Sequence, residues 1–362
     1  MSRRPPQTRY AQSSGAKIAY QVSGTGPPDL VMVHGLISHL DLQWQLTEYR
    51  RFVRALEQGG RVIRLDKRGT GLSDPVTELP TVQQRVQDVA AVMAAARSTR
   101  AVLFGLSDGG RAAIAFAAAY PGRTRGLILY GTSYRGPRAA LLRRYRSAVR
   151  HWGEGRLTEL VAPSLTGPGT RQAAGAFERA AASPAMAAAL VESLGLMDVR
   201  DLMRKLVVPT LVLHRDGDVI PAADAHAVAA EIPGAKLTIL PGPDHLPWVG
   251  DWAPVIGEIL AFVGQVAPSP ARPPRSRRGS GPARTGPPRP VVGWLSLTDA
   301  ELPVVRLAGQ GLTNTQIAGR LFLSRYTVET HLKHAFAKLG VESRAQLATL
   351  VAGQDDRPGP DT

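Results

Sequence analysis

This 362-residue chain contains no cysteine, which excludes disulfide bonds, thiolate metal sites and thiol nucleophiles together. It also lacks a long hydrophobic run. The most apolar stretch, residues 112–120, is closed by Arg111 and Pro121 and is far too short to span a bilayer. The basic N-terminus is not followed by an apolar segment, so no secretory signal is expected. These absences favour a soluble, cytoplasmic protein without membrane contact.

Acidic residues are few: the chain contains 29 Asp and Glu against 44 Lys and Arg, which gives a net charge of +15. Such an excess indicates a polyanionic partner. Residues 267–293 hold six arginines and no acid among many Pro, Gly and Ser residues. We interpret this segment as an extended linker, and favour a solvated tether over one that also touches DNA phosphates. It divides a first domain (1–266) from a second (294–353), which a disordered tail (354–362) follows.

Before the linker, segments typical of strands alternate with segments typical of helices. Short β-rich runs occur at residues 30–33, 62–65, 101–104, 126–130, 210–214 and 236–240. Alternation of this kind predicts an α/β domain in which helices cover a largely parallel sheet. The strand signal disappears between residues 133 and 205, where helical spacing predicts a cap inserted over the sheet.

A candidate nucleophile follows the third of these runs. Residues 105–109 read Gly-Leu-Ser-Asp-Gly, which fits G-x-S-x-G between a strand and a helix. The glycines permit a tight turn that lifts Ser107 above the sheet edge, so the pattern predicts a nucleophile elbow. The alternative is a serine that only caps the helix.

Candidate partners follow Ser107 in a characteristic order. Asp218 lies in the loop after the strand at 210–214, and His245 lies in the loop after the strand at 236–240. We expect His245 to act as general base and Asp218 to orient it. Asp216 is the alternative acid, and otherwise a turn former.

The backbone N–H groups of Leu36 and Asp108 are the expected oxyanion donors, because they follow the first strand and the nucleophile. His34 is expected to brace this loop. A carboxylate pointing inward beside an oxyanion would oppose catalysis, so the Asp108 side chain is expected to face outward at the helix N-terminus.

Residues 10–265 resemble the α/β-hydrolase superfamily. The resemblance rests on HG at 34–35, DKRGTGLSD at 66–74, GLSDGG at 105–110, AAYPGRTRGLILYG at 118–131 and the segments around Asp218 and His245. The set resembles specifically the serine-hydrolase-like domains that are joined to LuxR-type or adenylate-cyclase output domains. The resemblance implies a Ser/His/Asp site, a small-molecule ligand or substrate and no cofactor. No metal site is expected.

The second domain has helical spacing at residues 313–321 and 325–339, joined by a short turn, after a helix start near Thr298 and Glu301. Residues 294–352 resemble the LuxR-type helix-turn-helix domain. That resemblance implies binding to double-stranded promoter or operator DNA through residues of the second and third helices: Thr313, Asn314, Thr327, Glu329, Thr330, Lys333 and His334.

A two-fold pair of such domains would double the contacts, so we expect a homodimer. The helix at 343–351, with Leu347, Leu350 and Val351 apolar, is the candidate dimer surface. The alternative is packing against the recognition helix within one subunit, and the two uses are compatible. Together the two domains predict a cytoplasmic, nucleoid-associated transcriptional regulator that senses, and slowly hydrolyses, a small-molecule ligand. Two alternatives stay open: a working esterase-like enzyme with an attached DNA-binding domain, and a dead hydrolase used only for dimerisation.

Overall fold

A computed structural model of the chain describes residues 4–76, 78–267, 297, 301–321 and 323–355. The chain divides into two compact units, Met1–Arg272 and Pro273–Thr362. Apart from residue 267, the predicted linker lies outside the described residues, as do Thr298 and the predicted tail beyond residue 355. The two units are described separately below.

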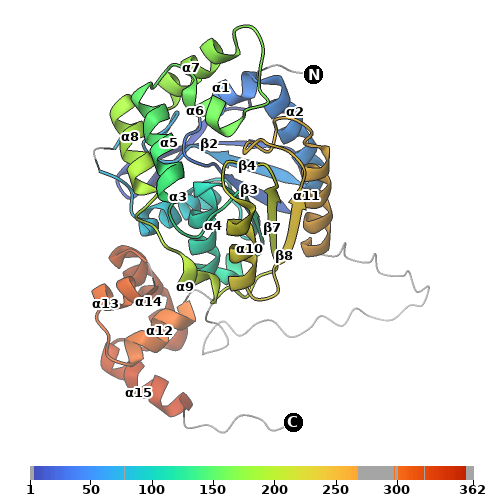
Figure 1. The fold of residues 1–362 in the computed structure, drawn as a ribbon. Helices are drawn as coiled ribbons and strands as arrows, with labels where there is room; N and C mark the ends of the chain where they lie inside the picture. Colours follow the sequence, from blue (N-terminus) through green and yellow to red (C-terminus); the bar gives the residue numbers. More distant parts are fainter. Residues whose placement is uncertain (1–3, 77, 268–296, 298–300, 322, 356–362) are drawn as a thin grey trace, which may run out of the picture. The chain divides into compact units, whose positions relative to one another are not determined.

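The first unit is built on an eight-stranded sheet with the order β1-β2-β4-β3-β5-β6-β7-β8 (Figure 1). Strands β3 to β8 run parallel, and β1 and β2 form an antiparallel hairpin that pairs with β4. The predicted runs are confirmed as β3 to β8, whereas the hairpin was not predicted. The strands are β1 Arg9–Ser13, β2 Ala16–Ser23, β3 Asp29–Val33, β4 Arg61–Leu65, β5 Ala101–Leu106, β6 Thr124–Tyr130, β7 Thr210–Arg215 and β8 Lys236–Leu240.

Side chains alternate between the two faces of this sheet, as the period of a strand requires. In β3, Leu30 and Met32 join one apolar cluster, while Val31 and Val33 join the other. Helices α3, α4 and α10 cover the face of Val31 and Val33, and α1, α2 and α11 cover the face of Leu30 and Met32. Their bounds are α1 Leu40–Gln45, α2 Thr47–Leu56, α3 Val82–Ala95, α4 Asp108–Ala119, α10 Ala222–Glu231 and α11 Ala253–Val266.

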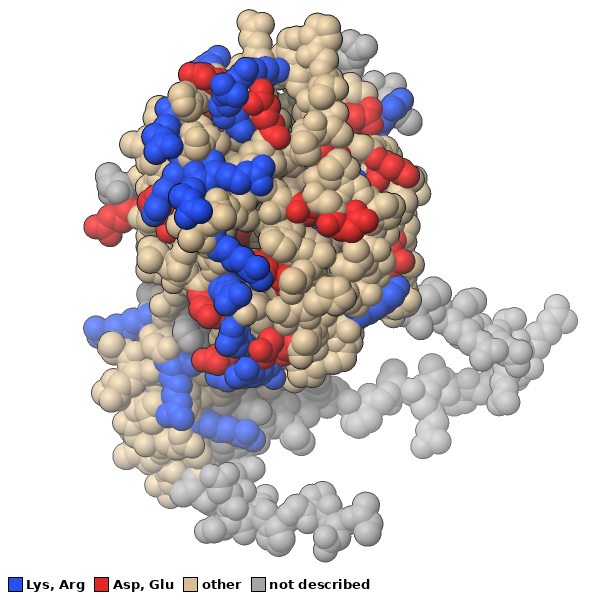
Figure 2. Space-filling view, in the orientation of Figure 1, with Lys and Arg blue, Asp and Glu red and all other residues tan. Residues whose placement is uncertain are grey.

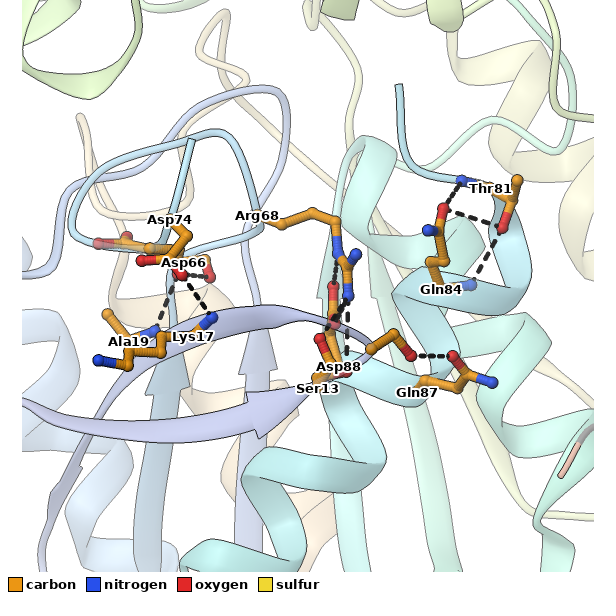
Figure 3. Close-up of polar contacts among 12 residues, drawn as sticks. Ser13, Lys17, Ala19, Asp66, Arg68, Asp74, Thr81, Gln84, Gln87 and Asp88 are labelled. Carbon is orange, nitrogen blue, oxygen red and sulfur yellow. Dashed lines mark hydrogen bonds and ion pairs between the residues drawn. The ribbon is translucent and has the colours of Figure 1, made fainter. Parts of the chain in front are cut away.

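The segment after β4 is fixed by buried polar contacts (Figure 3). Asp66 accepts hydrogen bonds from the Ser38 hydroxyl and from the backbone N–H groups of Leu40 and Leu72. Arg68 forms a buried ion pair with Asp88 of α3, in which the Arg68 Nε and Nη2 atoms donate to the two carboxylate oxygens of Asp88. These bonds hold the loop at the carboxyl edge of the sheet, where the candidate site lies.

Between β6 and β7 the chain forms five helices, in the segment predicted from the sequence to be a cap. They are α5 Ala139–Arg150, α6 Arg156–Val161, α7 Thr170–Ala181, α8 Pro184–Ser193 and α9 Arg200–Met203. Helices α5 and α8 share an apolar cluster of their own, which includes Leu141, Tyr145 and Val191. Helices α5 and α8 therefore have a small core of their own, while Val199 and Met203 at α9 join the apolar cluster of Val31 and Val33.

The second unit contains helices α12 to α15 around a core that includes Val305, Ile317 and Leu332. Their bounds are α12 Glu301–Gly309, α13 Asn314–Leu321, α14 Arg325–Leu339 and α15 Arg344–Asp355. Ser324 caps α14 by accepting a hydrogen bond from the Thr327 backbone, and Gly340 ends this helix with a φ of 66°. Among the described residues, no helix is both long and apolar enough to cross a membrane.

Candidate active site

Ser107 lies at a strained turn between β5 and α4. Its φ of 51° and ψ of −123° fall where only glycine is comfortable. The turn also needs glycine on both sides: a Cβ at Gly109 would lie 2.3 Å from the Val33 and His34 carbonyl oxygens, and one at Gly105 would lie 2.5 Å from the Gly110 Cα. Strain maintained in this way is a feature of a serine presented for chemistry.

His245 and Asp218 are in direct contact. The His245 Nδ1 atom lies 2.8 Å from Asp218 Oδ2 and 3.0 Å from Oδ1, and both residues are buried. Asp218 Oδ1 also accepts a hydrogen bond from the Ile220 backbone. Asp216, in contrast, is exposed and accepts a hydrogen bond from Gly242, as a turn residue would. The contact with His245 is made by Asp218.

Ser107 and His245 both line one cavity of about 400 Å³, so the fold brings the sheet edge and the histidine loop together. Most of its lining is apolar and comes from the loop after β3, from α2, from the cap and from the segment after His245. Leu36, Leu106, Tyr145, Leu157, Phe177 and Trp248 are among these residues. A cavity of this size and character fits an apolar small molecule with few polar groups.

The loop after β3 lies against Ser107. A Cβ at Gly35 would lie 3.0 Å from the Ser107 Cβ, and Leu36 lines the cavity beside it. His34 is buried behind this loop, where its Nδ1 donates to the Leu65 carbonyl at 3.2 Å and its Nε2 accepts from the Tyr49 hydroxyl at 2.8 Å. Burial lowers the pKa of His34 to about 3, and the nearby positive charge of Arg64 contributes to this shift. The ring is therefore neutral.

The expected orientation of the Asp108 side chain was wrong. Instead of facing outward, the carboxylate is buried and contacts three cations: Lys67 Nζ at 3.0 Å, Arg85 Nη1 at 2.7 Å and Arg111 Nη2 at 2.7 Å. Burial alone would raise the pKa of Asp108, but the three cations hold it well below its usual value. Three buried positive groups cannot remain unpaired in a protein interior, and this outweighs the preference for solvent at a helix N-terminus.

This cluster was not found from the sequence. Lys67 lies inside the quoted motif at 66–74, but nothing in its spacing indicates a contact with a residue 41 positions later. Burial lowers the pKa of Lys67 to about 8, although the negative charge of Asp108 acts in the opposite direction. Arg111 also donates to the carbonyl oxygens of Leu194 and Met197, at 2.8 and 3.0 Å. The cluster therefore joins α4 to the segment after α8.

In the second unit, the predicted DNA-facing residues lie on α14 and at the start of α13. Lys333, His334 and Glu329 are exposed, and Thr327 and Thr330 are half-buried. Glu329 pairs with Arg325 at 3.0 Å. The Thr313 hydroxyl accepts a hydrogen bond from the Gln316 backbone, as a helix cap does.

Asn314 and two apolar residues of α15 make contacts inside the helix-turn-helix domain. The Asn314 side-chain oxygen accepts a hydrogen bond from Arg344 at 2.5 Å, which joins α13 to α15. Leu347 and Val351 are buried in the domain core, where α15 packs on α12. This apolar face therefore packs within one subunit, on α12. Its use as a dimer surface stays a prediction. In the part of the chain that the structure describes, no group of three or more His, Asp or Glu side chains could hold a metal ion.

Comparison with known proteins gives two family matches. Residues 26–248 match the family model "Serine aminopeptidase, S33", an α/β hydrolase, and residues 295–351 match "Bacterial regulatory proteins, luxR family". A putative HTH-type transcriptional regulator of Mycobacterium tuberculosis is 53% identical over 77 residues, which are 21% of this chain and 8% of the relative. The chain therefore spans only a small part of the regulators it matches.

The first domain has relatives of its own. The pimeloyl-[acyl-carrier protein] methyl ester esterase of Nitrosospira multiformis is 25% identical over 256 residues, which are 65% of this chain and 94% of the relative. A thermophilic esterase from Thermogutta terrifontis has a similar fold, with a TM-score of 0.59, 26% identity and coverage of 72% of this chain and 99% of that one. The chain belongs to the α/β-hydrolase family of that S33 model, and its C-terminal domain is of the luxR family of bacterial regulatory proteins.

Proposed function

We propose that this protein is a cytoplasmic, nucleoid-associated transcriptional regulator that binds promoter or operator DNA as a homodimer. Its hydrolase domain binds a small-molecule ligand in the apolar cavity and hydrolyses it slowly. Ser107, Asp218 and His245 form the triad, and no cofactor or metal takes part. The observation that carries the proposal is that a strained serine shares a cavity with a histidine bonded to a buried aspartate, in a chain that also has a luxR-family domain.

The proposed chemistry is acyl transfer. The Ser107 hydroxyl oxygen attacks the carbonyl carbon of an ester while His245 takes the hydroxyl proton, and Asp218 stabilises the imidazolium. The backbone N–H groups of Leu36 and Asp108 stabilise the oxyanion of the tetrahedral intermediate. Collapse breaks the bond to the leaving alcohol, which receives the proton from His245. Water, activated by His245, then releases the acid and restores the serine.

A fluorophosphonate probe tests the triad, since it reacts with an activated serine. Ser107→Ala is expected to abolish labelling of the full chain. His245→Ala and Asp218→Asn are expected to reduce its rate strongly, whereas Asp216→Asn, which changes an exposed acid in the same loop, leaves the rate unchanged. Undiminished labelling of Ser107→Ala would contradict the assignment. Equal effects of Asp216→Asn and Asp218→Asn would remove Asp218 from the triad.

The DNA-binding half of the proposal rests on α14, whose Lys333 is exposed where a recognition helix meets DNA. Lys333→Ala is expected to weaken binding to all sequences if it contacts phosphate, or at one base pair if it reads guanine. Thr330→Ala is expected to act mainly on specificity. Selection from a random pool followed by footprinting measures both effects. A short asymmetric site protected by one monomer would contradict the homodimer.

A working esterase is the second candidate. The named esterases among the relatives and the apolar cavity beside Ser107 favour it. The two candidates differ in turnover: a sensor needs only occupancy, whereas an enzyme releases product many times. Steady-state hydrolysis of p-nitrophenyl esters by the wild type, with Ser107→Ala as the control, separates them. The third possibility, a dead hydrolase, requires that Ser107 does not react at all.

A further inference from the structure

Little of the positive charge of this chain lies in its luxR-family domain. Residues 294–353 contain six Lys and Arg and four Asp and Glu, a net charge of +2, and the tail at 354–362 contains one Arg and three Asp. The linker at 267–293 holds six arginines, and the remaining excess lies in residues 1–266. Affinity for DNA depends on cations that displace counterions from phosphates. A domain with a net charge of only +2 has few cations for this part of DNA binding.

Within the first domain, the excess is concentrated on helix α5. Arg138 precedes this helix, and Arg143, Arg144, Arg146 and Arg150 lie in it. Residues 138–150 contain no Asp or Glu. All five arginines are exposed. Cations three and four positions apart repel one another on a helix, and Arg143, Arg146 and Arg150 have this spacing. Like charges therefore repel one another along the exposed side of this helix.

The arginines lie opposite the buried side of α5. Leu141, Tyr145 and Ala148 pack into the cap core, and Tyr145 also lines the cavity beside Ser107. A rotation of about 100° per residue puts Arg143, Arg146 and Arg150 on the outward side. Figure 2 shows Lys and Arg gathered over the side of the molecule where α5 and α8 lie in Figure 1. We call Arg138, Arg143, Arg144, Arg146 and Arg150 the α5 arginine face.

Nearby acids neutralise little of this face. Glu192 of α8 pairs with Arg146 at 2.7 Å. Glu159 is paired with Arg156 and Arg171, and buried Glu178 accepts hydrogen bonds from the backbone N–H groups of residues 153, 155, 157 and 158. Arg143, Arg144 and Arg150 form no ion pair with any residue in the described ranges. Their charge is available to an external partner.

We propose that the α5 arginine face binds the phosphate backbone of double-stranded DNA, in addition to the helix-turn-helix. This goes beyond the proposed function and rests on its DNA-binding half. Guanidinium groups match phosphate oxygens with paired hydrogen bonds. An anionic membrane fits less well, because a helix that binds a membrane presents apolar side chains to it, and the apolar side of α5 is buried in the cap.

The test uses the full chain and a labelled random-sequence duplex, with affinity measured by fluorescence anisotropy from about 50 to about 200 mM salt. Arg143→Gln/Arg150→Gln removes two charges and keeps good helix formers. Arg143→Lys/Arg150→Lys retains the charge. Arg9→Gln/Arg100→Gln is the matched control, because both residues are exposed and lie outside the cap. Circular dichroism establishes that each variant is folded.

Two lost phosphate contacts are expected to reduce the slope of log K against log salt by about 2, at about 0.9 for each contact, and to weaken binding about tenfold or more near 0.1 M salt. The lysine variant and the matched control keep the wild-type slope. A glutamine variant that behaves like the matched control would overturn the proposal. Wild-type protein that binds phosphatidylserine vesicles more tightly than DNA would overturn it as well.

Lys333→Ala, measured in the same way, separates this inference from the proposed function. Loss of affinity in Lys333→Ala, with none in the α5 glutamine variant, leaves the helix-turn-helix function in place and removes the α5 contact. Loss in the α5 variant, with none in Lys333→Ala, supports the α5 contact and counts against recognition through α14.

Discussion

Two neighbouring residues at the start of α4 have different tasks. Ser107 is maintained in a strained conformation at the cavity, while Asp108 turns its side chain away from the cavity into a buried group of cations. The Asp108 backbone is thereby left to serve as an oxyanion donor, as proposed. A negative side chain is tolerated beside an oxyanion site because Lys67, Arg85 and Arg111 outweigh its charge.

Asp108→Asn is expected to lower the free energy of unfolding by about 3–5 kcal/mol, the usual cost of leaving one side of a buried ion pair alone. Lys67 can lose its proton, since its pKa is about 8, but the two guanidiniums keep their charge. Urea denaturation measures the change, and Asp216→Asn serves as an exposed control in the same domain. A loss below about 1 kcal/mol would mean that the cations find solvent or other partners.

His34 predicts a pH dependence of stability. Its pKa is about 3 in the folded protein and 6.5 in the unfolded chain, so the unfolded state binds an extra proton between these values. Stability should therefore fall as pH drops below 6.5, by up to about 1.4 kcal/mol per pH unit from this group. Urea denaturation at pH 7 and pH 5 measures the slope. His34→Gln should give a flatter slope than the wild type, whatever its absolute stability, and an unchanged slope would show that His34 is not the cause.

At the scale of elements, helix α15 shows how an apolar face is used. Leu347 is fully buried where α15 packs on α12, so it belongs to the core of the small domain. Leu347→Ala is expected to destabilise that domain by about 2–5 kcal/mol, and Thr349→Ala, on the exposed side, to change little. Thermal unfolding of the full chain at two protein concentrations tests this. A loss of dimer without any change in the unfolding temperature would instead assign Leu347 to a subunit interface.

At the scale of the whole molecule, a sensor requires that occupancy of the cavity and DNA affinity influence each other. Coupling between two sites is reciprocal, and is usually about 5- to 150-fold. Covalent labelling of Ser107 with a fluorophosphonate that carries an apolar chain should therefore change affinity for the selected DNA by a factor in this range. Ser107→Ala treated with the same probe is the control. Equal affinity before and after complete labelling would count against sensing and in favour of an independent enzyme.

The sequence by itself determined the two folds and the order of the candidate triad. Parallel strands end at one edge of a sheet, so a serine, an aspartate and a histidine that follow three such strands are expected to meet there. The many spaced matches at 294–352 indicated a luxR-like domain in the same way. Both inferences depend on local patterns and on topology, which a single chain displays directly.

Only the tertiary structure decided which side chains touch. Asp216 and Asp218 lie in one loop, and the contact with His245 depends on how that loop folds. The orientation of Asp108 depended on cations from three separate parts of the chain. The hairpin of β1 and β2 was not predicted, and the choice for α15 between packing and a free surface depended on α12. The hairpin is a local feature, in which Ser13 pairs with Ala16 across a two-residue turn. The other three features depend mainly on contacts between distant residues, whose burial and charge pairing have no signature in local spacing.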